Sequence, residues 1–273
     1  MSQGMRSERS ITVVVPLVPA HDKFVPELIE QLSSERNVIA SVILARSSAR
    51  KRNLRNLQLM IPRLQSDHGL EIQVLATRQQ QLAGQNRNRG WGNAHTPFTA
   101  FLDADDEYAT DRLSRLLEVA ESEASDLVLH DFMLKELETD QIPATSWTMQ
   151  DLVRTDELYD ATFAQGRDRL KEGLTPGDTN VIVPSSSTEY RSVHHGHVLV
   201  RTNLRRTFRY STLYPGEDGQ FCRDVLWGGG NVTYVPARLS AYRPKLSAEM
   251  DSSFLFKVRR RIRRLGRRML VHS

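Results

Sequence analysis

Short runs of apolar, mostly β-branched residues recur through the first half of the chain, separated by polar segments. The first run, Ile11–Val15, is followed directly by Pro16, so we expect a buried parallel strand that stops at this proline. Four more runs predict strands of the same kind: Val38–Ala45, Glu71–Ala76, Phe98–Leu102 and Leu127–His130.

Segments with helical periodicity lie between these runs. Asp22 can cap a helix that continues to about Ser34, and its apolar face would consist of Phe24, Leu28, Ile29 and Leu32. A basic segment from Ser48 to Leu64 could also be helical. The segment Thr110–Glu123 places Leu113, Leu116, Leu117 and Ala120 on one face. Strands that alternate with helices at this spacing predict a doubly wound α/β sheet.

The regular pattern fades between about Lys135 and Arg191, and short apolar runs return at Val198–Val200 and Val232–Val235. We therefore divide the chain into a nucleotide-binding half (residues 1–133), an acceptor-binding half of the same domain (134–245) and a C-terminal tail (246–273).

Composition narrows the class of protein. With 273 residues, 39% of them hydrophobic and 26% charged, the chain can bury a sizeable core. A single cysteine, Cys222, excludes an internal disulfide framework and a cysteine-based zinc site. The polar N-terminus lacks the apolar core of a signal peptide, and no apolar run approaches the length of a membrane span. These features predict a cytoplasmic protein.

Three acidic residues, Asp103, Asp105 and Asp106, directly follow the strand Phe98–Leu102. Ligands of open α/β sheets bind beyond the carboxyl ends of the strands, which is where these acids would lie. In an extended backbone Asp103 and Asp105 would share a side, and two carboxylates suit Mn²⁺ or Mg²⁺ with its bound phosphates. The alternative, for Asp106 in particular, is a solvated turn or cap residue.

Together with three further segments in the same order, this pattern resembles the family 2 glycosyltransferases of the GT-A fold. The segments are Ile11–Pro16, then Arg87-Asn-Arg-Gly90, then Gly216-Glu-Asp-Gly-Gln-Phe221 with Tyr242-Arg243 after it. The resemblance spans roughly residues 10–245, with a poorly matched middle. It implies a Rossmann-like mixed sheet with helices on both faces. It also implies inverting transfer of a sugar from a nucleotide-sugar donor, dependent on Mn²⁺ or Mg²⁺.

The same resemblance implies roles for individual residues. Asp103 and Asp105 would hold the metal and the donor diphosphate. Asp218 would be the general base, and Glu217 would orient it or bind acceptor hydroxyls. The other residues implied at the donor site are Pro16, Arg87, Asn88, Gly90 and Arg243, with Asn88 and Gly90 shaping a loop.

Glu217 and Asp218 also suit the first turn of a helix over Gln220–Leu226, because acidic residues stabilise helix N-termini. This interpretation is compatible with a catalytic role for the pair.

Two departures from the family pattern affect the prediction. The second strand ends in Arg46 where the family commonly has an acid that contacts the nucleotide base, so the nucleotide is left open. Asp22 could replace that acid, or could simply cap a helix. Pro244-Lys245 stands where the family often has a histidine. Because no Gln-x-x-Arg-Trp motif follows the Glu-Asp pair, we expect a non-processive enzyme.

The three histidines His194, His195 and His197 cluster before the predicted strand at Val198. They could form a metal site, in which His195 and His197 would share a side of the strand, or they could lie in the acceptor pocket or at the surface.

The segment Phe254–Leu270 carries seven arginines and one lysine beside an apolar stripe at helical spacing. This basic amphipathic helix could bind an anionic membrane surface, could bind a nucleic-acid backbone, or could pack on the domain. In the first case the enzyme would be peripheral at the membrane.

The sequence leaves the acceptor open among a glycan, a lipid-linked sugar, a protein and a modified nucleobase. Two rival functions also stay open. A metal-dependent nucleotidyltransferase could place the same acids at a strand end, and a degenerate GT-A module could act as a scaffold.

Overall fold

The computed structural model describes residues 10–134, 182–184, 190–192, 196–212 and 217–243. The basic tail 246–273, His194 and His195, and most of the segment where the sequence pattern fades lie outside these residues. Among the described helices, none combines the length and the apolar character that spanning a bilayer requires.

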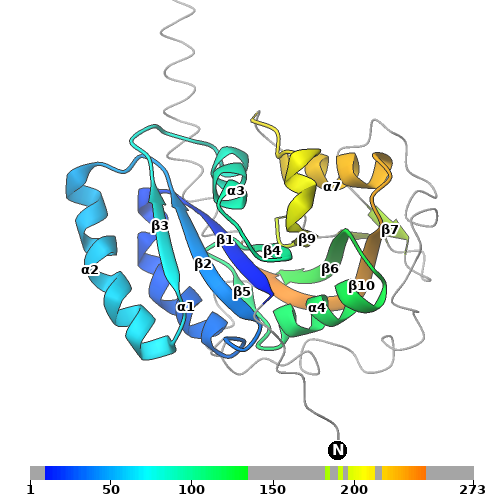
Figure 1. Cartoon of the computed structure of the whole chain (residues 1–273), viewed down its shortest axis with the longest axis horizontal. Helices are drawn as coiled ribbons and strands as arrows, with labels where there is room; N and C mark the ends of the chain where they lie inside the picture. The colour runs from blue at the N-terminus through cyan, green and yellow to red at the C-terminus, as the bar shows by residue number, and fades with distance from the viewer. Residues whose placement is uncertain (1–9, 135–181, 185–189, 193–195, 213–216, 244–273) are drawn as a thin grey trace, which may run out of the picture.

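An eight-stranded mixed sheet forms the centre of the molecule (Figure 1), with the strand order β3-β2-β1-β4-β9-β6-β10-β5. Its strands are β1 (Ile11–Leu17), β2 (Ile39–Arg46), β3 (Ile72–Ala76), β4 (Phe98–Phe101), β5 (Glu107–Tyr108), β6 (Leu127–Leu134), β9 (Leu199–Arg201) and β10 (Val232–Tyr242). A separate hairpin pairs β7 (Ile182–Pro184) with β8 (Tyr190–Ser192). The predicted α/β class is confirmed, and strands from both predicted halves share one sheet.

Strands β1 to β4 are parallel, whereas β9 is antiparallel to its neighbours β4 and β6. The carboxyl ends of β1, β2 and β4 therefore meet at one edge of the sheet. Ligands of open α/β sheets bind at such an edge.

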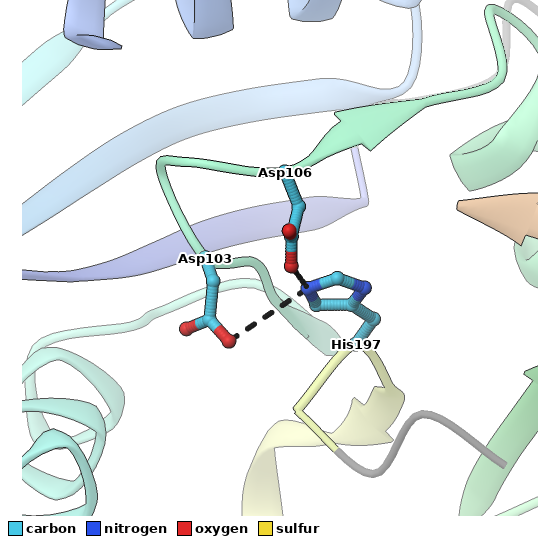
Figure 2. A group of neighbouring side chains, drawn as sticks. All are labelled: Asp103, Asp106 and His197. Carbon is cyan, nitrogen blue, oxygen red and sulfur yellow. Dashed lines mark ion pairs between the residues drawn. The ribbon is translucent and has the colours of Figure 1, made fainter. Parts of the chain in front are cut away.

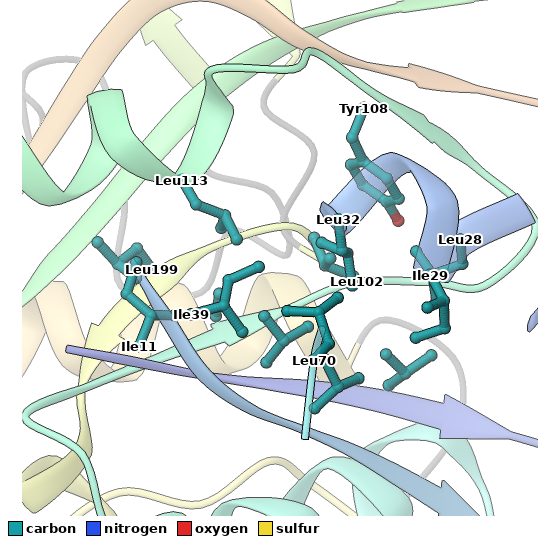
Figure 3. Close-up of a cluster of buried hydrophobic side chains, with 14 of the residues drawn as sticks. Ile11, Leu28, Ile29, Leu32, Ile39, Leu70, Leu102, Tyr108, Leu113 and Leu199 are labelled. Atoms are coloured by element: carbon teal, nitrogen blue, oxygen red, sulfur yellow. The ribbon is translucent and has the colours of Figure 1, made fainter. Parts of the chain in front are cut away.

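Helices cover both faces of the sheet. They are α1 (Val25–Ser33), α2 (Lys51–His68), α3 (Ala83–Gly92), α4 (Arg112–Ser122) and α7 (Glu217–Trp227), with 3-10 turns η1 (Pro19–Phe24) and η3 (Thr202–Arg206). Apolar residues of α1, α2 and α4 pack on one face, and those of α3 and α7 pack on the other. Figure 3 shows part of the first core, to which α1 contributes Leu28, Ile29 and Leu32, β2 contributes Ile39 and α4 contributes Leu113.

The first strand does not end at Pro16 as predicted but continues through it to Leu17. The carbonyls of Ser10 and Val14 accept hydrogen bonds from β4 and the residue after it, so every second residue of β1 turns its polar groups toward β4. Pro16 is in this set, but β4 has ended at Phe101 by then. Its missing N–H therefore costs the sheet no hydrogen bond.

Helix α1 begins at Val25, and Asp22 does not cap it as predicted. Asp22 lies in η1 and makes no capping hydrogen bond. A carboxylate does cap α4, where Glu35 accepts the N–H groups of Leu113 at 2.8 Å and Ser114 at 2.6 Å. Glu35 thereby joins the end of α1 to the start of α4.

We expect Glu35→Gln to lower the free energy of unfolding by about 1–2 kcal/mol, because an amide offers one acceptor oxygen where two backbone N–H groups need one each. Urea unfolding followed by circular dichroism measures this loss. Glu30→Gln, an exposed change on the preceding helix α1, is the control and should stay within about 0.5 kcal/mol of the parent protein. Equal stabilities of the two variants would contradict the capping role.

Candidate active site

The three acids after β4 lie in a tight turn at the carboxyl edge of the sheet. Asp105 is 4% exposed and Asp106 is 3% exposed, whereas the side chain of Asp103 is 26% exposed. Asp106 is therefore not the solvated turn residue that the sequence allowed. Among the three, Asp103 offers its carboxylate most openly to a ligand.

Asp103, Asp106 and His197 form the cluster best arranged to hold a metal ion within the described part of the chain (Figure 2). One ligand atom from each lies within 4.8 Å of the others. His197 Nε2 is 3.1 Å from Asp106 Oδ2 and 3.7 Å from Asp103 Oδ2. His197 thus belongs to a candidate metal site, one of the two options left open by the histidine cluster.

Asp105 lies outside this cluster, although the sequence paired it with Asp103. That pairing assumed an extended backbone, but Ala104 and Asp105 form a turn in which the Asp106 N–H approaches the Asp103 carbonyl at 3.5 Å. The turn brings Asp106, rather than Asp105, toward His197 (Figure 2). A ligand role for Asp105 stays a prediction.

Tyr108 of β5 holds the backbone of this turn through its hydroxyl group. Its hydroxyl donates to the Asp103 carbonyl at 2.5 Å and accepts the Asp103 N–H at 2.8 Å. The same oxygen is 3.2 Å from His197 Nε2. Burial, and then the charge of Asp106, raise the pKa of Tyr108 well above its ordinary value, so the hydroxyl stays protonated.

The hydrogen bonds around His197 favour the tautomer with a hydrogen on Nε2, although the other tautomer would keep the contact with Ser240. Because the Tyr108 hydroxyl hydrogen points to Asp103, His197 Nε2 carries the hydrogen that it shares with Tyr108 and Asp106. Nδ1 then accepts from Ser240 Oγ at 3.0 Å. Ser240 could equally accept a hydrogen from Nδ1, which would free Nε2 to bind a metal. Two carboxylates and an imidazole that can switch in this way fit a divalent cation.

Arg87 connects the turn to the opposite wall of the site. Its Nη2 donates to both oxygens of Asp103, at 2.8 and 3.1 Å, and its Nη1 donates to Glu217 Oε1 at 3.0 Å. The side chain is 3% exposed and lies over the ring of Tyr210. Burial alone would lower the pKa of Arg87, but Asp103 and the other nearby acids raise it above its usual value. The guanidinium therefore remains charged.

The segment Arg87–Gly90 is part of helix α3 and not the loop that was predicted. Asn88 donates to the Tyr210 carbonyl at 2.8 Å and accepts the Tyr210 N–H at 2.9 Å. A Cβ at Gly90 would lie 2.4 Å from Val14 Cγ1, so this glycine lets α3 approach β1. Both residues hold Arg87 in place within the structure.

Glu217 and Asp218 start helix α7, which confirms the predicted helix. Glu217 faces Arg87, and its pKa is raised by burial and by Asp218 although Arg87 lowers it. Asp218 is partly exposed, and its Oδ1 accepts the N–H of Gly219 at 2.8 Å. Arg87 therefore lies between the carboxylate of Glu217 and the turn that carries Asp103.

An ion pair between Arg46 and Asp22 lies at the carboxyl ends of β1 and β2. The side chain of Arg46 is fully buried, and its Nε and Nη2 donate to the two oxygens of Asp22 at 2.7 and 2.8 Å. Arg46 also donates to the Ser47 carbonyl. Pro16 is buried one residue before the end of β1. The arginine that replaces the family's acid is thus neutralised by Asp22, whose side chain is 18% exposed.

Arg243 follows β10 and binds the turn through its backbone. Its N–H donates to Asp106 Oδ1 at 3.0 Å, while its guanidinium pairs with Glu27 at 2.8 Å and with Glu107. The side chain is therefore engaged by two glutamates in this structure, and a contact with the donor stays a prediction.

The family model described as "Glycosyl transferase family 2" matches residues 55–186. This match covers just under half of the chain and supports the resemblance to the family 2 glycosyltransferases. A comparison with curated proteins gives no match.

Solved structures of GT-A glycosyltransferases share the fold of this chain. The crystal structure of S. aureus TarS 1-349 has a TM-score of 0.55 at 15% identity, covering 88% of this chain and 62% of that one. The same protein in complex with UDP-GlcNAc gives 0.53 at 14% identity, covering 86% and 58%. The mannosyltransferase PcManGT from Pyrobaculum calidifontis, in complex with GDP-Man and Mn²⁺, gives 0.55 at 14% identity, covering 87% and 58%. This chain thus spans about three fifths of the length of these structures.

Tyr108 was not predicted from the sequence, and for Asp106 a role as a solvated turn or cap residue was left open. The strand Glu107–Tyr108 has two residues, too few to show a periodic pattern. The Asp-Asp-x-Tyr spacing after an apolar strand is the one signal that could have drawn attention to both residues.

We expect Asp22→Ala to lower the free energy of unfolding of the protein by about 3 kcal/mol, because it leaves the charge of Arg46 buried and unpaired. Arg46→Met in the same chain should restore most of that loss, since it removes the orphaned charge. Urea denaturation of both variants measures the difference. Asp67→Ala breaks the exposed pair with Arg63 and should cost less than about 1 kcal/mol. An Asp22→Ala protein as stable as the Asp67→Ala protein would contradict this account.

Proposed function

We propose that the chain is a non-processive glycosyltransferase that moves a sugar from a nucleotide-sugar donor to an acceptor hydroxyl, with inversion at the anomeric carbon. One observation carries this proposal. Asp103, Asp106 and His197 meet at the carboxyl end of β4, and Arg87 links Asp103 to Glu217, which adjoins Asp218 at the start of α7.

A bound Mn²⁺ or Mg²⁺ would neutralise the diphosphate as negative charge develops on the leaving oxygen. Asp103 and Asp106 would hold it, with Asp105 as a further candidate ligand. Tyr108 holds the backbone of Asp103, and His197 orients Asp106. The carboxylates are thus fixed before the donor arrives, which lowers the reorganisation needed in the transition state.

Asp218 would act as general base. The acceptor oxygen attacks the anomeric carbon while its proton passes to Asp218, and the bond to the diphosphate oxygen breaks with its electron pair on that oxygen. The N–H of Gly219 holds one carboxylate oxygen of Asp218, which leaves the other available to accept the proton. Glu217, bound to Arg87, would position its neighbour.

The structural neighbours support the class of donor. S. aureus TarS 1-349 has been solved in complex with UDP and with UDP-GlcNAc, and PcManGT in complex with GDP-Man and Mn²⁺. β2 ends in Arg46 where an acid could contact a nucleotide base, and Arg46 is paired with Asp22. The donor is accordingly proposed as a class, nucleotide-diphosphate sugars, and the base is left to experiment.

A panel of UDP-, GDP-, dTDP-, ADP- and CDP-sugars with Mn²⁺ should contain a ligand that raises the melting temperature by several degrees, since a ligand that binds only the native state stabilises it by mass action. Differential scanning fluorimetry gives the shift. Asp103→Asn and Asp106→Asn should abolish it, while Asp67→Asn, a distant exposed change, should retain it. A panel that shifts no protein, or that shifts Asp103→Asn as much as the parent, would overturn the donor site.

Asp218→Asn should lower kcat by about 10²–10⁴-fold, because an amide cannot accept the acceptor's proton. The same variant should keep the metal-dependent thermal shift of the parent protein. Product formation with the donor found in the panel, or donor hydrolysis when the acceptor is unidentified, measures kcat. Gln220→Ala, exposed on the same helix, is the control. Parent-level turnover by Asp218→Asn would rule out this base.

A further inference from the structure

Arg87 occupies the position that a cation bound to Asp103 would need to share. One nitrogen, Nη2, donates to both oxygens of Asp103, at 2.8 and 3.1 Å. Asp103 is also the most exposed member of the candidate metal cluster. In this structure the protein therefore supplies its own positive charge to the carboxylate that is most accessible to a metal.

Arg87 has a second acidic partner that does not belong to the metal cluster. Its Nη1 donates to Glu217 Oε1 at 3.0 Å, and the Glu217 side chain is 9% exposed. Nε of Arg87 is buried without a hydrogen-bond partner, so its described side-chain hydrogen bonds go to these two carboxylates, beside the ring face of Tyr210 and the nearby charge of Asp218. A buried guanidinium that lost both carboxylates would carry a large desolvation cost.

We propose that Arg87 is an internal counter-ion that competes with the divalent cation for Asp103, and that Glu217 holds Arg87 when the cation takes over. This inference rests on the proposed function, because it assumes that Asp103 binds the metal. Arg87 is a positioning residue in this scheme. It keeps Asp103 and Glu217 at a fixed separation before the metal binds.

The charges give the expected direction of each effect. A guanidinium a few ångströms from a divalent cation repels it, and the partly exposed site moderates this repulsion without removing it. Removing Arg87 should therefore strengthen metal binding, although Arg87 lies in the site. Removing the charge of Glu217 should weaken metal binding. Of the two carboxylates that bind Arg87, Asp103 would then be the one that is still charged, so Arg87 would hold it more strongly against the metal. A purely structural arginine would not give effects of opposite sign.

The experiment measures the dissociation constant for Mn²⁺ alone, without nucleotide, by electron paramagnetic resonance of the free ion. We expect Arg87→Met to bind Mn²⁺ about tenfold more tightly than the parent protein, and Glu217→Gln to bind it several-fold more weakly. In the double variant, the effect of Glu217→Gln should shrink to less than about half of its value in the parent, because the two residues act through one another.

Arg89→Met is the matched control, since Arg89 lies on the same helix but donates to Asn86. Its loss should change the Mn²⁺ dissociation constant by less than about twofold. Circular dichroism confirms that each variant is folded. If Arg87→Met does not fold, Glu217→Gln alone decides the matter.

Arg87→Met binding that equals or falls below that of the parent would overturn the counter-ion role, and so would unchanged or tighter binding by Glu217→Gln. These outcomes leave the proposed function intact as long as the parent binds Mn²⁺ and Asp103→Asn does not. A parent protein that binds no Mn²⁺, alone or with any nucleotide-sugar of the panel, would instead overturn the proposed function and this inference with it.

Discussion

The buried guanidinium of Arg87 is the interaction on which the candidate site depends. It joins Asp103 at the end of β4 to Glu217 at the start of α7, two segments more than 100 residues apart in the chain. The side chains of Arg87 and Glu217 are nearly buried, and that of Asp103 is only partly exposed. Buried charges are tolerated only when they are paired, so this ion-pair network fixes the relative positions of the three groups. The turn that carries Asp103 and the start of helix α7 thereby acquire a defined separation.

The scaffold around Arg87 explains why the guanidinium can be held so firmly. Gly90 allows α3 to lie directly on β1, and Asn88 ties the helix to the backbone of Tyr210. Trp91 packs edge-to-face against Phe101 and Phe221, which connects α3 to β4 and α7. The elements that carry the charged groups are thus joined by apolar contacts as well as by ion pairs.

A second buried arginine, Arg46, is neutralised at the ends of β1 and β2. There Arg46 and Asp22 neutralise each other in a bidentate pair. Both oxygens of Asp22 are already hydrogen-bonded, so any nucleotide base that approached Asp22 would meet an acceptor with fewer free lone pairs than an unpaired carboxylate. The departure from the family pattern at Arg46 is therefore compensated within the protein.

The sequence determined the elements whose apolar residues follow a regular period. The runs that became β1, β2, β3, β4 and β6 are long enough to be recognised, and the order of the acidic motifs indicated the family and the wall formed by Glu217 and Asp218. Helix α3 was missed because its residues, Ala-Gly-Gln-Asn-Arg-Asn-Arg-Gly-Trp-Gly, include poor helix formers and few apolar positions. Its helical form comes from packing, which a local pattern does not contain.

Only the tertiary structure decided which side chains meet. The turn at Ala104–Asp105 selected Asp106 over Asp105 as the neighbour of His197, which reaches the site from a segment 91 residues further along the chain. Arg87 and Arg243 were expected at the donor site, yet both are held by carboxylates of the protein itself. The reason is physical. A sequence shows that a charge is present, but the distance to its partner, and the water excluded from between them, are set by long-range packing.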